Sequence, residues 1–199
     1  MTKPAIPIPI RPGEGPGVLG MRLLLLSLGV LFLAALAGLW FAPGRSQPLR
    51  TVLPPLLAGS TAALLVAGIL LRRALQKIRR YDRPPFRRLL LAGLGAGAGF
   101  LILQAPALGS LLTRHAEAAA MVGSAAAAGA QPGLLFVLLL LHALHVVAGL
   151  LAVGWVAWRA HSDPRRYTPD DHTPVRHAVM YWGFLETIWL VMLAAFLVI

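Results

Sequence analysis

Residues 133–158 have the sequence GLLFVLLLLHALHVVAGLLAVGWVAW, and this stretch decides the fold class of the chain. It contains no Asp, Glu, Lys or Arg, and its only ionisable side chains are those of His142 and His145. About 20 predominantly apolar residues are enough for a helix to cross a bilayer. The stretch therefore predicts a transmembrane helix that carries two histidines.

The whole chain has the composition of an integral membrane protein. Its 199 residues are 58% hydrophobic and only 13% charged, whereas soluble domains contain about 25% charged residues. We expect an all-α polytopic protein in which a flexible tail, residues 1–19, precedes a single five-helix transmembrane domain, residues 20–199. The five predicted spans cover residues 23–41, 52–71, 89–112, 133–158 and 178–199. For the Ala-rich run 116–130 we expect a loop that can include a surface helix.

The basic residues indicate how the chain crosses the membrane. All but three of the 18 Lys and Arg residues lie before the first span, between the second and third, or between the fourth and fifth; the exceptions are Arg45, Arg50 and Arg114. The positive-inside rule then places the N-terminus in the cytoplasm and the C-terminus outside a bacterial inner membrane. Attraction to lipid headgroups accounts for the net charge of +11, so we expect membrane lipids and no nucleic acid as partners.

Polar side chains inside the predicted spans are candidate functional residues, because a buried ionisable group is costly unless it is paired. These side chains are Gln104, His142, His145 and Glu186. The two histidines are three residues apart and share a helix face, and Glu186 lies on one stripe of the last span with Trp182 and Trp189. We expect the four residues to be interhelical polar anchors, which pair with one another or with backbone carbonyls across helix interfaces.

The histidine pair is also compatible with other roles. Haem b held by two histidines normally needs ligands from two facing helices. No other predicted span contains a histidine, so we do not expect this chain to hold haem b. His142, His145 and Glu186 could supply three metal ligands, or the histidines could relay protons. A small metal-binding or transport protein that uses these three residues is therefore an alternative to the polar anchors. The chain has no cysteine, so thiolate metal sites are excluded.

The third span contains closely spaced glycines. Gly93 and Gly97 form one GxxxG pair, and Gly95 and Gly99 form another. Because no strand is predicted before them and no phosphate-binding lysine follows, a nucleotide loop is excluded. We expect these glycines to let neighbouring helices approach closely.

Two C-terminal segments resemble subunit III of the haem–copper respiratory oxidases. FVLLLLHALHVVAGLL (136–151) is similar to the family's His-Gly-x-His-Val pattern, through His142, His145, Val146 and Gly149. HAVMYWGFLETIWLVMLAAF (177–196) is similar to its last-span pattern, through Tyr181, Trp182, Phe184 and Trp189. Residues 20–27, 53–68 and 86–105 resemble earlier family segments, and five spans match the family's short bacterial form.

The chain also departs from the family pattern. Leu28 and Ala107 occupy positions where the family commonly has acids. Ala143 stands in place of glycine, Gly183 in place of histidine and Glu186 in place of aspartate. These departures indicate a divergent branch.

The resemblance implies a non-catalytic accessory subunit that supports the stability and proton uptake of a terminal oxidase. Such a subunit binds no redox cofactor, and haem and copper are expected in partner subunits. Bound phospholipid is expected in this chain. The expected direct partner is subunit I, and subunit II and other subunits belong to the same complex. The complex could oxidise cytochrome c or quinol in aerobic respiration. The alternative within the superfamily is an accessory subunit of a nitric oxide reductase.

Overall fold

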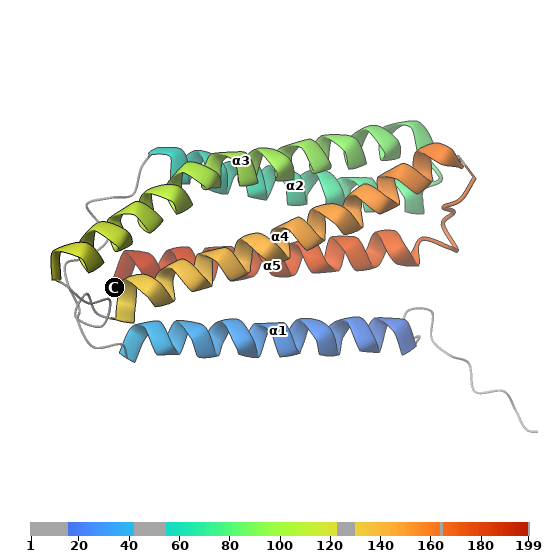
Figure 1. Cartoon of the computed structure of the whole chain (residues 1–199). Helices are drawn as coiled ribbons and strands as arrows, with labels where there is room; N and C mark the ends of the chain where they lie inside the picture. Colours follow the sequence, from blue (N-terminus) through green and yellow to red (C-terminus); the bar gives the residue numbers. More distant parts are fainter. Residues whose placement is uncertain (1–15, 42–54, 123–129, 164, 199) are drawn as a thin grey trace, which may run out of the picture.

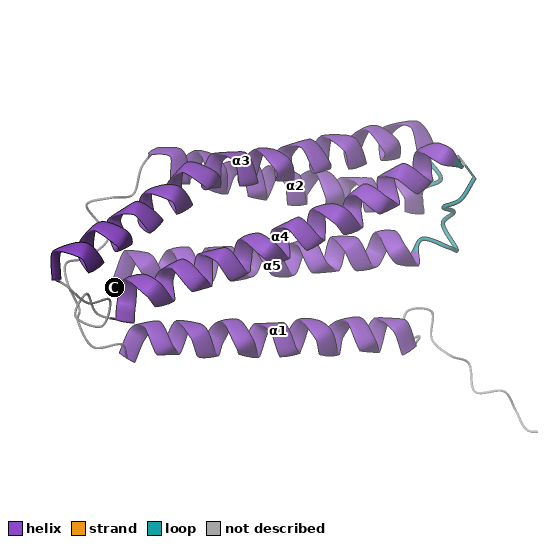
Figure 2. Cartoon of the chain, viewed as in Figure 1, coloured by secondary structure: helices purple, strands orange, loops and turns teal. Residues whose placement is uncertain are grey.

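Five long helices make up the described part of the chain. The computed structural model describes residues 16–41, 55–122, 130–163 and 165–198. Within these ranges all regular structure is helical, and each helix contains a segment long and apolar enough to cross a membrane (Figure 2). The helices are α1 (Pro16–Phe41), α2 (Pro55–Arg79), α3 (Arg83–Val122), α4 (Ala130–Ser162) and α5 (Thr173–Val198). The predicted all-α architecture is confirmed for the described residues, which form five helices long and apolar enough to span a membrane.

Helices α2 to α5 form a ring, and α1 lies outside it. Contacts join α2 to α3, α3 to α4, α4 to α5, and α5 back to α2, whereas α1 contacts only α4 and α5. Consecutive helices run in opposite directions (Figure 1). Consequently the start of α1, the α2–α3 turn and the α4–α5 connection lie together at one end of the bundle. We call this end, to which most of the basic residues belong, the basic end.

The helices continue beyond the apolar runs that predicted them. α2 extends past Leu71 to Arg79, and only residues 80–82 separate it from α3. Tyr81 adopts a positive φ of 62° in this turn, and the Asp82 amide donates to the Lys77 carbonyl at 3.0 Å. The basic segment expected to connect two spans is therefore mostly helical, because a helix can carry charged side chains once it has left the hydrocarbon region.

The Ala-rich run corrects a prediction. Residues 116–122 belong to α3, and α4 begins at Ala130, so the expected loop is wrong for these parts. Alanine has the highest helix propensity, which lets α3 continue where the hydropathy falls. Residues 123–129 lie outside the described range, as does the predicted tail up to residue 15, whereas Pro16 already begins α1.

α5 contributes the largest side chains to the core of the ring. Trp182, Leu185, Trp189 and Met192 are all fully buried and follow one face of this helix. α1 is the opposite case: most of its large apolar side chains are exposed, and Phe32 is one of few that are buried. Its outer face therefore suits lipid or another membrane subunit rather than water.

Candidate functional site

His142 lies in an aromatic cluster at the centre of the protein. Its ring is stacked on Trp189 of α5, with centroids 5.4 Å apart and 27° between the planes. The rings of Phe100 in α3 and Phe32 in α1 meet it edge-on at 6.2 and 6.1 Å. The side chain is 1% exposed, and neither ring nitrogen has a hydrogen-bond partner among the described residues. His142 thus joins four helices by packing rather than by a polar contact.

His145 makes its polar contact within its own helix. Its Nδ1 donates to the Leu141 carbonyl at 2.6 Å, one turn earlier in α4. The link to α5 uses the backbone instead, because the Tyr181 hydroxyl donates to the carbonyl oxygen of His145 at 3.2 Å. The Phe32 ring packs edge-on against the imidazole at 5.3 Å.

Glu186 pairs with an arginine of α2. Its Oε2 accepts from Arg72 Nη1 at 2.6 Å, and the carboxylate side chain is 7% exposed while the arginine is 47% exposed. Of the two pairings expected for these anchors, with one another or with backbone carbonyls, the first is not seen here, since Glu186 pairs with Arg72 and with neither histidine. α5 presents this carboxylate to α2, where Arg72, placed just beyond the apolar run, brings a compensating charge to the buried carboxylate.

Gly68 makes the position of Glu186 sterically feasible. A Cβ atom on Gly68 would overlap with Oε1 of the carboxylate. Sequence reasoning missed both Gly68 and Arg72, since the glycine lies outside the GxxxG pairs and the arginine was interpreted as a topology signal. The lone acid in the last span was the available clue, because a buried carboxylate requires a cation nearby.

A second polar chain joins α2 to α3 and α5. Trp189 Nε1 donates to Thr61 Oγ1 at 3.0 Å, and that hydroxyl in turn donates to the Leu57 carbonyl at 2.8 Å. Ser60 Oγ lies 3.0 Å from the same carbonyl and 3.4 Å from Gln104 Oε1. Gln104 of α3 thus lies close to Ser60 of α2.

Large side chains of α5 occupy the space that glycines leave free. A Cβ atom on Gly97 would collide with the ring of Trp182, and one on Gly149 would lie 2.9 Å from Leu185 Cδ1 and 3.3 Å from Tyr181 Cε1. Gly97 and Gly149 are therefore packing positions between α5 and the neighbouring α3 and α4.

The other glycines of α3 divide between two faces. A Cβ atom on Gly93 would lie 2.8 Å from Leu71 Cδ2, whereas nothing lies within 4 Å of one on Gly95 or Gly99. The Gly93–Gly97 pair packs inside the bundle. No described residue lies close to the Gly95–Gly99 pair, so the expectation of close helix approach is not met there within the described part of the chain. Phe184 extends the α5 contacts outward, because its ring meets that of Phe32 at 6.5 Å.

The site offers no set of metal ligands within the described residues. No three His, Cys, Asp or Glu side chains there are close enough together to hold an ion. Since His142, His145 and Glu186 all lie within this range, they do not form a three-ligand metal site. The arrangement fixes helices against one another.

Comparison with known proteins agrees with this picture. No protein-family model matches the chain. Over 51 residues the chain is 39% identical to the protein named cytochrome c oxidase subunit 3 of Thermostichus vulcanus. The aligned segment covers 26% of this chain and 25% of that protein. Over 57 residues it is 39% identical to the protein of the same name from Synechocystis sp., covering 29% of this chain and 24% of that protein. The matched segments thus span about a quarter of the length of these relatives. Over these segments the chain is thus similar to two proteins named cytochrome c oxidase subunit 3.

Proposed function

We propose that this chain is a non-catalytic accessory subunit III of a haem–copper terminal oxidase. The observation that carries the proposal is the 39% identity to two proteins named cytochrome c oxidase subunit 3. The geometry adds support, because the family-like residues of α4 and α5 lie against each other. His142 stacks on Trp189, and Tyr181 donates to the backbone of His145.

The role we assign to the chain is structural. Its buried polar groups hold helices together through the Arg72–Glu186 ion pair and the Trp189–Thr61 hydrogen bond. Haem and copper belong to subunit I, which we propose as the direct partner, with subunit II in the same complex. This chain has Leu28 at a position where the family has an acid. We therefore assign its contribution to proton uptake to the stabilisation of subunit I.

The proposed orientation follows from the basic end. Twelve of the 18 basic residues lie in or near the α2–α3 turn and the α4–α5 connection. These two connections lie at the same end of the bundle (Figure 1). By the positive-inside rule this end faces the cytoplasm, so the N-terminus is inside and the C-terminus outside a bacterial inner membrane. Cysteine substitutions at Arg79 and Arg165, labelled in intact cells, test this: reaction with an impermeant thiol reagent before lysis would contradict it.

Isolation from native membranes tests the complex. An affinity-tagged chain, extracted in mild detergent, is expected to bring down a haem–copper subunit I, identified by mass spectrometry of its peptides. A tagged unrelated five-span protein from the same membranes is the control. Consumption of oxygen rather than nitric oxide by the isolated complex would support an oxidase. A chain that purifies alone with stoichiometric zinc or iron would refute the proposal.

A further inference from the structure

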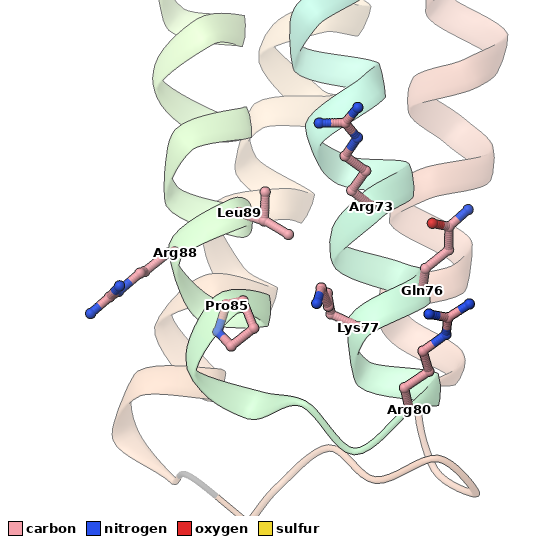
Figure 3. A pocket seen from close by; sticks show the side chains of 7 residues that line it. All are labelled: Arg73, Gln76, Lys77, Arg80, Pro85, Arg88 and Leu89. Atoms are coloured by element: carbon pink, nitrogen blue, oxygen red, sulfur yellow. The ribbon is translucent and has the colours of Figure 1, made fainter.

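A small cavity lies where the α4–α5 connection meets the α2–α3 hairpin at the basic end. Its volume is about 10 Å³, which is close to the space that one water molecule needs. Three helices and the connection line it: Ile78 of α2, Arg83, Phe86 and Arg87 of α3, Ala160 of α4, and Asp163 and Tyr167 of the connection. The side chains drawn in Figure 3 line a separate groove between α2 and α3, and none of them lines this cavity.

Tyr167 contributes a buried hydroxyl to the cavity. The residue is 3% exposed, and its ring packs edge-on against Phe86 with the centroids 6.3 Å apart. The hydroxyl oxygen has no hydrogen-bond partner among the described residues. Burial raises the pKa of Tyr167 above its ordinary value, although Arg159 and Arg166 act in the opposite direction. The hydroxyl therefore keeps its proton at neutral pH and can both donate and accept.

Arg83 and Asp163 add a donor and an acceptor to the same lining. Arg83 Nη2 donates to the Tyr81 hydroxyl at 2.7 Å, whereas its Nε is buried and has no partner in the described part of the chain. Asp163 Oδ1 accepts from the Arg165 amide at 2.9 Å. A carboxylate can accept about four hydrogen bonds, so Asp163 has capacity left. A buried polar group without a partner is costly, and two such groups line one cavity.

The size and charge of the cavity decide which ligand it suits. A volume of about 10 Å³ excludes an organic molecule. Arg83 and Arg87 disfavour a cation, and the carboxylate of Asp163 disfavours an anion such as chloride, which is also larger than water. Buried waters typically make about three hydrogen bonds. The lining offers that number, through one N–H donor, one carboxylate acceptor and one hydroxyl.

We propose that one ordered water molecule occupies this cavity and links Tyr167 and Asp163 to Arg83. The water accepts from Nε of Arg83 and from the Tyr167 hydroxyl, and it donates to the Asp163 carboxylate. It thereby fastens the α4–α5 connection to the start of α3. The proposal goes beyond the assignment to an oxidase and does not depend on it, because all the residues of the site belong to this chain.

Hydrogen exchange of the purified full-length chain, followed by mass spectrometry, tests the proposal. The amides of Arg166 and Thr168 report on the connection, since they donate to the Asp163 and Asp171 carbonyls at 3.1 and 3.2 Å. Y167F removes the hydroxyl and keeps the ring, and R83K removes the Nε donor and keeps the charge. The control is Y81F, which removes the exposed hydroxyl at the other end of Arg83.

We expect Y167F to speed exchange of these amides about three- to tenfold, because a bridging water is nearly as good as a direct hydrogen bond. R83K should have an effect of similar size. In the Y167F/R83K double variant the effects should multiply to less than the product of the two, since both remove partners of the same water. Y81F should stay within about twofold, because solvent replaces a hydrogen bond lost at an exposed hydroxyl.

Four results would overturn the proposal. Unchanged or slower exchange in Y167F would mean that the hydroxyl is buried without a partner. Fully multiplicative effects in the double variant would show that Tyr167 and Arg83 share no ligand. An equal effect in Y81F would trace the change to Arg83 alone. Exchange that depends on replacing chloride by gluconate would identify an anion site.

A direct observation keeps the proposal testable if Y167F does not fold, as judged by circular dichroism and size-exclusion chromatography. A density map of the unmodified chain that resolves ordered waters should show one peak between Tyr167, Arg83 and Asp163. Such a map without a peak there would contradict the proposal, as would a bromide anomalous signal at this place.

Discussion

Replacement of Gly97 by alanine tests how closely α5 packs against α3. A Cβ atom at this position would collide with the outer ring of Trp182 and would lie 2.9 Å from Leu150 Cδ2. Trp182 is only 1% exposed, so its rigid indole cannot move out into solvent. The G97A variant must therefore shift the tryptophan or separate the helices.

The expected cost follows from this overlap. Adding a methyl group to a well-packed core usually costs about 1–3 kcal/mol of unfolding free energy. The matched control is G99A, two residues along the same helix, where an added Cβ meets nothing within 4 Å. That substitution should leave stability unchanged or raise it by about 0.5–1 kcal/mol, because alanine loses less backbone entropy than glycine in a helix. The two variants should differ by about 1–4 kcal/mol.

Unfolding in mixed detergent micelles, followed by far-ultraviolet circular dichroism, measures the difference. W182F provides a second check, because phenylalanine lacks the outer ring that the new methyl group would meet. The G97A/W182F double variant should therefore lose less unfolding free energy than the sum of the losses in the two single variants. The difference, which is the coupling energy, should be about 1 kcal/mol or more. Equal stability of G97A and G99A would refute the packing of Trp182 over Gly97.

Three further sets of variants test the polar and aromatic contacts by the same unfolding assay. T61V removes the acceptor for the Trp189 indole and should cost about 1–3 kcal/mol, whereas T61S should be close to the original chain; equal effects would contradict the hydrogen bond. R72Q leaves the carboxylate of Glu186 unpaired and should cost about 1–2 kcal/mol, less than a fully buried pair because the arginine is 47% exposed. The R72Q/E186Q double variant should recover part of this loss, and no recovery would show that the pair is unimportant. H142A should cost about 2–4 kcal/mol by leaving a cavity, while H142F should cost less because neither imidazole nitrogen has a partner in the described part of the chain; the opposite order would indicate an unseen polar contact.

The sequence was sufficient to predict the architecture because hydropathy alone identifies membrane spans. Apolar runs near 20 residues leave few alternatives to helices when no water can satisfy the backbone. The ends of the helices were not predictable in this way. α2 continues to Arg79 and α3 to Val122 because helix formation does not stop where the hydrocarbon region ends. Hydropathy indicates which residues lie in the hydrocarbon region, whereas the ends of a helix depend on helix propensity and capping.

The site was predictable in its members and only partly in their pairing. His142, Gln104 and Glu186 were identified because polar groups within spans are rare. Their partners depended on the rotation of each helix about its axis, which a single sequence does not specify. Arg72 became the partner of Glu186 because α5 packs against α2 as well as α4. His142 lies in an aromatic cluster because side chains from three other helices surround it.

The most direct test of the central claim is the haem content of the complex isolated on the tagged chain. A reduced-minus-oxidised difference spectrum, with copper measured on the same sample, reports whether redox centres accompany the chain in fixed proportion. The proposed function predicts haem and copper in stoichiometric amounts, both lost when the partner subunits are stripped away with stronger detergent. A chain isolated in native form from actively respiring membranes without haem or copper would contradict it.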